Sequence, residues 1–131
     1  MTLDAFVQRA VGVPFAPGYD FTGWHCWGLV VAAYREVLGV DLPRHADVSV
    51  HERLRIARRM AHGEACFGRV DAPAPLDVIV MGLHSGRRFG HVGLADGQGH
   101  VLHVEEASHT VLEPLDSPLI RGRVRGVFRH V

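Results

Sequence analysis

Apolar residues recur at helical spacing in three stretches of the first half of the chain. Residues 2–11 predict a short helix that Gly12 ends. Residues 26–38 carry apolar side chains at i, i+3, i+4, i+7 and i+11, which indicates an amphipathic helix that Gly39 terminates. Residues 49–63 begin with a capping-box pattern and share an apolar face, so they predict a third helix.

After residue 75 the pattern changes to the β-branched runs and two-residue period that are typical of strands. The predicted strands are residues 77–81, 91–96, 100–105, 108–113 and 123–130. A glycine-rich turn joins the second and third of them, which predicts a hairpin. Helices followed by antiparallel strands give an α+β fold. No repeat or second domain is visible, so residues 1–131 are expected to form a single domain.

The composition narrows the function classes. The chain has 131 residues, 47% of them hydrophobic, and 14 basic side chains balance 14 acidic ones. That balance argues against nucleic-acid binding, and no apolar run is long enough to suggest a membrane span. The start of the chain does not resemble a signal peptide, and two cysteines do not make a disulfide framework. We therefore expect a protein made in the cytoplasm. We also expect no cofactor and no metal.

The predicted hairpin can bring two histidines together. Any odd-length loop places His91 and His103 on one face, because directly opposed residues share a face. A three-residue loop that begins at Gly97 would set Gly93 opposite His103, with His91 on the diagonal. A loop that begins one residue earlier would set the two histidines opposite each other, and a two-residue loop would separate them. Gly93 and Ala95 share the histidine face, and their small size is expected to leave space there.

Cys26, at the start of the second predicted helix, is the expected occupant of that space. A thiolate is the nucleophilic form of cysteine, and the positive end of a helix dipole stabilises it. A neighbouring imidazolium stabilises the thiolate further and can lower the pKa from about 8.5 to between roughly 3.5 and 7.5. Cys26, His91 and His103 can therefore serve as nucleophile, base and orienting group.

The motifs GWHCWGLV (residues 23–30) and HVGLADGQGHVLHV (residues 91–104) resemble those of the NlpC-type cell-wall cysteine peptidases, a papain-like family with a Cys-His-His site. The resemblance covers essentially the whole chain. It implies a fold in which the Cys helix packs on an antiparallel sheet. It also implies hydrolysis of a peptidoglycan stem-peptide bond, typically between D-glutamate and a diamino acid. Cys26 matches the nucleophile, His91 the general base and His103 the third polar residue.

The lead-in VGVPF and the segment GVDLPRH resemble the branch of this family found in phage tail gene clusters and gene transfer agents. This branch implies a virion component that opens the cell wall locally. The implied partners are a tail hub, baseplate or fibre protein and the stem peptide, with no nucleic acid and no membrane. We expect assembly into a phage-like tail in the bacterial cytoplasm and action in the periplasm or cell wall.

The chain departs from the family pattern at two positions. The family usually has aspartate where this chain has His25, and tends to have a tyrosine near Phe15 that assists the oxyanion site. Tyr19 is a candidate replacement for that tyrosine, and the backbone N–H of Cys26 is the other oxyanion donor. The neighbouring arginines 87 and 88 (Arg87, Arg88) precede the first histidine and are candidates for binding substrate carboxylates.

Other interpretations stay open at this point. Cys26 by itself could be an inert core thiol, as we expect for Cys66. A zinc site would need His25 and Cys26 with both hairpin histidines, but structural zinc sites favour ligand pairs with a short spacer. The remaining alternatives are a structural or adaptor tail-tip protein with an idle site, and acyl transfer by the same three residues. Surface positions are expected for the other histidines considered: His45, His51, His84, His100 and His109. The arginines of the third helix are expected on a solvated face: Arg53, Arg55, Arg58 and Arg59.

Overall fold

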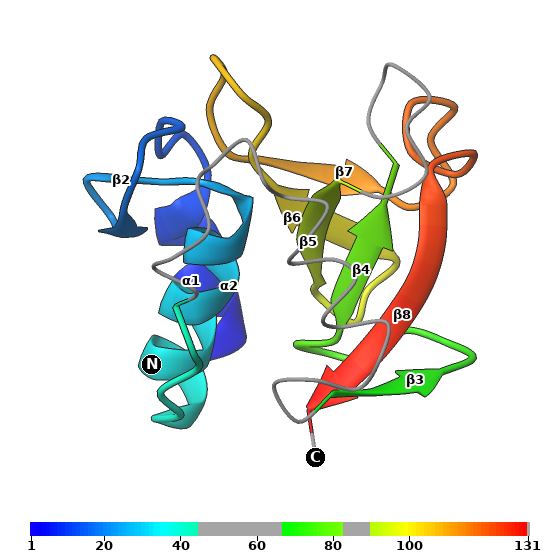
Figure 1. Ribbon diagram of the computed structural model, residues 1–131, viewed down its shortest axis with the longest axis horizontal. Coiled ribbons are helices and arrows are strands. Elements are labelled where there is room, and N and C mark those ends of the chain that lie inside the picture. The colour runs from blue at the N-terminus through cyan, green and yellow to red at the C-terminus, as the bar shows by residue number, and fades with distance from the viewer. Residues whose placement is uncertain (45–66, 83–89, 131) are drawn as a thin grey trace.

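The computed structural model describes residues 1–44, 67–82 and 90–130 of the chain. Its elements follow in the order α1 (Leu3–Ala10), β1 (Tyr19–Asp20), β2 (Gly23–Trp24), α2 (Cys26–Ala33), the π-helical turn η1 (Tyr34–Leu38), β3 (Phe67–Val70), β4 (Val78–Met81), β5 (His91–Ala95), β6 (His100–His103), β7 (Val111–Pro114) and β8 (Val124–His130). Helices come first and an antiparallel sheet follows (Figure 1), so the predicted α+β fold is confirmed.

Six of the described strands form one antiparallel sheet in the order β3-β8-β4-β5-β6-β7. The second predicted strand lies in the middle of it as β5, between β4 and β6. Leu94 pairs with Leu102 and Ala95 with Val101, so the loop of the β5–β6 hairpin begins at Gly97. This is the second of the two odd-length alternatives, and it sets Gly93 opposite His103. Both histidines consequently lie on one face of the sheet.

Helix α2 is buried on every side. All of its residues from Cys26 to Ala33 are buried, so the prediction of an amphipathic helix was wrong for this stretch. The polar residues Arg35 and Glu36 come only in the π-helical turn that follows, and Leu38 is half exposed. Gly39 adopts a left-handed φ of 67° and ends the helical stretch, as the sequence predicts. A helix surrounded by protein in this way has little freedom to shift.

The sheet presents two different apolar faces. Cys26 belongs to the larger core cluster, which includes Val92, Leu94, Leu102 and Val104 of the hairpin. Ala95 and Val101 belong to a second cluster on the other face, with Ile79, Met81 and Ile120. Helix α2 therefore packs on the face opposite to Gly93 and Ala95.

The expectation that Gly93 leaves space for the Cys helix was accordingly wrong. A Cβ atom added at Gly93 would meet the Cγ2 of Val101 at 2.5 Å and the Cβ of His103 at 3.1 Å. The absent side chain makes room for the neighbouring strand β6, including side-chain atoms of Val101 and His103 and the carbonyl oxygen of Leu102. Gly93 thus serves the packing of the hairpin itself.

The segment between α1 and α2 is tied to the far end of the sheet. Thr2 caps α1 by accepting a hydrogen bond from the Ala5 amide. Further along this segment, the indole Nε1 of Trp24 donates a hydrogen bond to Thr110 Oγ1 at 2.8 Å. The Thr110 hydroxyl in turn donates to the carbonyl of Val13 at 2.9 Å. These buried bonds fix the entry to α2 against the segment between β6 and β7.

Residues Phe67–Val70 form the edge strand β3, which pairs with β8 and is absent from the strands predicted above. Phe67 is buried and Arg69, two residues further on the same face, is exposed, so this short strand has no two-residue period that the sequence could reveal. The predicted third helix, residues 49–63, and its arginines fall outside the described residues. Within the described ranges, no helix has the length and apolar character that crossing a bilayer requires.

The close approach of Gly28 to the preceding loop gives a test of this packing. A Cβ at Gly28 would overlap the carbonyl oxygen of Gly18, a backbone atom that cannot swing away. Alanine is favoured over glycine within helices by about 1 kcal/mol, but overpacking against backbone costs up to about 3 kcal/mol. We predict that Gly28→Ala lowers the free energy of unfolding in urea. Gly68→Ala, where nothing lies within 4 Å, is the control and should change it by less than about 0.5 kcal/mol. A neutral or stabilising Gly28→Ala would contradict the packing described.

Candidate active site

Cys26 is the first residue of α2, and its side chain is buried, with 2% of the residue exposed. The helix dipole places partial positive charge at this end, which favours a thiolate. Helix α2 packs on β5, the strand whose first residue is His91. Burial alone would equally suit an inert core thiol, so the chemistry of Cys26 depends on the groups that the sheet brings to this end of the helix.

His25 caps the N-terminus of α2. Its Nδ1 accepts a hydrogen bond from the Gly28 amide at 3.0 Å, and its carbonyl accepts one from the Leu29 amide. An imidazole nitrogen that accepts a hydrogen bond carries no proton, so His25 is neutral with its hydrogen on Nε2. Burial lowers the pKa of His25, which also favours the neutral form. The departure from aspartate at this position therefore preserves the cap and removes a negative charge beside Cys26.

The hairpin brings His91 and His103 into direct contact. The Nε2 of His91 lies 2.8 Å from the Nδ1 of His103, and both residues are almost fully buried. The Nε2 of His103 in turn lies 3.3 Å from a carboxylate oxygen of Glu113 on β7. Burial lowers the pKa of His103, and the nearby carboxylates of Glu113 and Glu105 oppose that effect. The side chains thus form a line of three groups across β5, β6 and β7.

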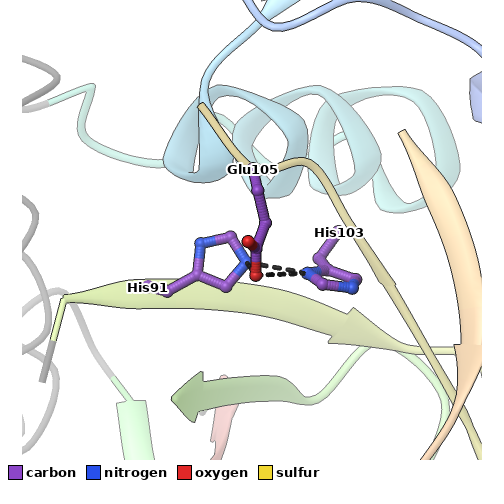
Figure 2. Close-up of side chains that lie close together, drawn as sticks. All are labelled: His91, His103 and Glu105. Atoms are coloured by element: carbon purple, nitrogen blue, oxygen red, sulfur yellow. Dashed lines mark hydrogen bonds and ion pairs between the residues drawn. The ribbon is translucent and has the colours of Figure 1, made fainter. Parts of the chain in front are cut away.

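Glu105 and Arg123 complete the group. The Oε1 of Glu105 lies 3.9 Å from the Nε2 of His91 and 3.9 Å from the Nδ1 of His103. Arg123 Nη2 lies 2.6 Å from the same oxygen. Figure 2 shows the carboxylate of Glu105 turned toward the two imidazole rings. Because the positive charge of Arg123 offsets the negative charge of Glu105, the carboxylate stabilises a protonated histidine less than an unpaired carboxylate would.

These donors could also be considered as a metal site. His91, His103 and Glu105 each offer one ligand atom, all within 4.8 Å of one another. Zinc with bonds of about 2.0–2.1 Å would hold the two imidazole nitrogens farther apart than 2.8 Å, and Arg123 already neutralises the carboxylate. The geometry fits a hydrogen bond between the histidines better than a shared ion.

A polar pocket of about 220 Å³ opens beside His103. Three carboxylates, two histidines and one arginine line this pocket. They are His103, Glu105, Glu106, His109, Glu113 and Arg123. The buried histidine line is therefore bordered by an acidic, solvent-reaching surface on the β7 side.

The other candidate site residues are the oxyanion candidate Tyr19 and the two substrate-binding candidates Arg87 and Arg88. The hydroxyl of Tyr19 donates to the backbone oxygen of Arg44 at 2.9 Å, and its ring meets His25 edge-on. That hydroxyl hydrogen is engaged, so the geometry lends no support to Tyr19 as an oxyanion donor. Arg87 and Arg88 lie outside the described residues.

Of the five histidines expected at the surface, the structure describes two. His109 is exposed, and His100 is partly exposed and contacts Asp96 at 3.0 Å. The other three, and Cys66, fall outside the described ranges: His45, His51 and His84.

Sequence reasoning missed the residues that surround the histidines. Val101 pairs with Glu113 and His103 with Val111, so Glu113 is a diagonal neighbour of His103 on the same face. The last residue of the predicted strand 108–113 could have been found by extending the hairpin register to that strand. Glu105 follows His103 by two residues and so shares its face of the predicted strand 100–105. No local pattern identifies Arg123, because the loop before β8 brings it to the site.

Comparisons with known proteins support the cell-wall peptidase resemblance. The model of the NlpC/P60 family matches residues 12–129. The NlpC/p60 domain of the peptidoglycan hydrolase SagA is 18% identical with a TM-score of 0.64, over 98% of this chain and 96% of that one. RipD from Mycobacterium tuberculosis, described as a non-catalytic NlpC/p60 domain protein adapted to peptidoglycan binding, is 20% identical with a TM-score of 0.61, over 99% of this chain and 95% of that one.

A third similar structure belongs to a longer protein. An NlpC/P60 family protein from Bacillus cereus ATCC 10987 is 22% identical with a TM-score of 0.70, over 98% of this chain but only 39% of its own length. Identities this low show a common fold. No curated protein sequence matches the chain.

The histidine cap of α2 predicts a pH-dependent stability. The pKa of His25 is lowered in the folded state, so the cap contributes fully above about pH 6.5, the pKa of an unfolded histidine. Its contribution is lost as the pH falls through the folded pKa, because a protonated Nδ1 cannot accept from Gly28. We predict that His25→Ala costs about 1 kcal/mol of unfolding free energy at pH 7.5 and progressively less below pH 6.5.

His25→Asp is the matched control for this prediction. Its carboxylate can cap the same amide but titrates near pH 4, so it should keep the stability over pH 5 to 7.5. Urea unfolding of the three proteins across this range measures the effect. An equal cost of His25→Ala at pH 5 and pH 7.5 would show that the cap does not titrate as described.

Proposed function

The chain belongs to the NlpC/P60 family, and we propose that it is a cysteine peptidase that hydrolyses the peptide part of peptidoglycan. Cys26 is the proposed nucleophile, His91 the general base and His103 the third member. The observation that carries the proposal is the buried His91–His103 hydrogen bond. The two rings meet edge to face, with a centroid distance of 5.0 Å, so each imidazole keeps a fixed orientation in the core. Helix α2 covers the other face of the sheet, so the proposal places Cys26, the first residue of α2, beside His91, the first residue of β5, where these two packed elements begin.

The reaction that these residues can perform has two halves. His91 takes the thiol proton, and the thiolate of Cys26 attacks the carbonyl carbon of the scissile amide. The amide at the start of α2 is the proposed donor to the oxyanion. His91 then gives its proton to the leaving nitrogen, and a thioester remains on Cys26. Water, deprotonated by His91, attacks the thioester and releases the carboxylic acid and the thiol.

The proposed substrate is a stem peptide, and the bond is that between D-glutamate and a diamino acid. The family resemblance supports this bond, and the similar domain of SagA comes from a protein named a peptidoglycan hydrolase. Arg87 and Arg88 precede the base along the chain and are proposed to bind stem-peptide carboxylates. Digesting purified peptidoglycan and identifying the new termini by mass tests the bond directly.

We also propose a delivery context in a phage-like tail. The lead-in VGVPF and the segment GVDLPRH, which resemble the tail and gene-transfer-agent branch, support it. The protein would be assembled with a tail hub, baseplate or fibre protein in the cytoplasm and would act on the cell wall. Particles purified from a strain that expresses the protein should contain it; their lack of it would contradict this context.

The alternative is a wall-binding or adaptor domain with an idle site. RipD, whose fold is similar, is described as non-catalytic and adapted to peptidoglycan binding. Such a domain would bind peptidoglycan without releasing new peptide termini. The digestion experiment therefore separates the two functions, provided that binding to insoluble peptidoglycan is measured in parallel.

Variants of the three proposed residues test the mechanism. Cys26→Ala and His91→Ala should each abolish stem-peptide cleavage, and the double variant should be little worse, because residues that act as a unit are not additive. His103→Ala should lose more than about tenfold but less than about 10⁴-fold, since both reacting groups remain while the base loses its orientation. His103→Asn should recover part of the loss, because its amide oxygen can accept from His91.

Cleavage by purified, folded variants at pH 6 to 8 provides the measurement. The exposed His109 gives a matched control, and His109→Ala should change the rate little. Full activity in Cys26→Ala would end the peptidase proposal. Full activity in His103→Ala would remove only the third member.

A further inference from the structure

We propose that Glu113 is a positioning residue that fixes the tautomers of both site histidines and stabilises the imidazolium formed during the reaction. This inference rests on the proposed peptidase function and adds a fourth member to it. Glu113 lies on β7, two strands away from His91, and neither the motifs nor the family resemblance pointed to it. Its carboxylate oxygen is 3.3 Å from the Nε2 of His103.

The direction of the hydrogen bonds follows from the carboxylate. An ionised carboxylate only accepts, so the Nε2 of His103 must carry the hydrogen that faces Glu113. Burial lowers the pKa of His103 and keeps the resting ring neutral. A neutral imidazole with its hydrogen on Nε2 has a lone pair on Nδ1. That Nδ1 is the atom 2.8 Å from His91.

The same logic continues to the base. Since the Nδ1 of His103 accepts, the Nε2 of His91 must donate to it. The neutral His91 ring then has its lone pair on Nδ1, the nitrogen that can take a proton from a thiol. One carboxylate at the edge of the site therefore sets which nitrogen of the distant base is reactive. With the opposite tautomers, His91 would present an N–H to the thiol and could not act as a base.

Glu105 is not equivalent to Glu113. Its Oε1 is 3.9 Å from each of the two facing imidazole nitrogens, too far for a hydrogen bond. Its distance of 2.6 Å to Arg123 Nη2 makes it part of an ion pair. Glu105 therefore contributes long-range charge, whereas Glu113 supplies both charge and a directional acceptor.

The charge of Glu113 also acts when His91 becomes protonated. A carboxylate on the far side of His103 favours the thiolate–imidazolium pair over the neutral pair. Several titratable or charged groups surround His103: His91 of β5, Glu105, Glu106 and His109 of the segment after β6, Glu113 of β7 and Arg123 before β8. Removing Glu113 should therefore lower the pKa of the imidazolium.

The first test reads the tautomers without any activity. Nitrogen-15 NMR of the Cys26→Ala protein, with and without Glu113→Ala, reports which nitrogen of each ring carries the hydrogen. We expect both rings in the Nε2–H form when Glu113 is present and a mixture of forms at His103 in Glu113→Ala. Glu113→Gln is nearly the same size and still offers an acceptor oxygen, so it should retain the Nε2–H form. Unchanged tautomers in Glu113→Ala, or rings that lack the Nε2–H form in the parent, would overturn the inference.

The second test uses the pH dependence of kcat/KM for stem-peptide cleavage. Glu113→Gln should narrow the bell-shaped profile from the alkaline side by about one pH unit, because the imidazolium loses a nearby negative charge, with the KM little changed. Glu113→Ala should show the same narrowing and a further loss of about tenfold at the optimum, which Gln restores. Glu106→Gln removes an equal charge from the same pocket and should leave the profile in place.

The outcomes separate this inference from the proposed function. A protein without peptidase activity but with the predicted tautomers would refute the function and leave the role of Glu113 in ring orientation standing. An active enzyme whose profile is equally narrowed by Glu106→Gln, or unaffected by Glu113→Gln, would refute the role of Glu113 alone.

Discussion

The complete burial of α2 is the constraint on which the site depends. A helix that is apolar on every side must be covered by the sheet on one side and by the N-terminal segment on the others. The bonds from Trp24 through Thr110 to Val13 hold that segment, and Gly28 lets the backbone at Gly18 approach the helix. The first residue of α2 consequently has one position relative to the sheet, and that residue is Cys26.

The cap of this helix and the histidine line of the sheet show two uses of neutral imidazole. His25 accepts from an amide with Nδ1 and so replaces an anionic cap by a neutral one. No carboxylate of the cap then opposes a thiolate on Cys26, and the helix dipole acts on it undiminished. His103 accepts a hydrogen bond from His91 and donates one to Glu113, so the carboxylate determines the tautomer of both rings. Burial lowers the pKa of both rings, and the neutral state that results is the one each hydrogen bond requires.

The sequence predicted the order of elements and the shared face of His91 and His103, because hydrophobic period and loop parity act over a few residues. It could not choose between two odd-length loops, and it placed the Cys helix on the wrong face. Which face of a sheet a helix covers depends on contacts across the whole core. The π-helical turn was missed for a similar reason, since the change of helical period occurs where the buried α2 meets exposed residues. The position of Glu113 beside His103 depends on the register between β6 and β7, which the sequence analysis did not predict.

The central claim is that Cys26 is an activated nucleophile, and the pH dependence of its alkylation by iodoacetamide tests this most directly. Peptide mapping by mass scores Cys26 separately from Cys66. We predict that Cys26 reacts as a thiolate with a pKa well below the ordinary value of about 8.5, and that His91→Gln returns the pKa toward that value. A Cys26 that reacts at pH 6 no faster than an ordinary cysteine, with or without His91, would contradict the account and favour an idle site.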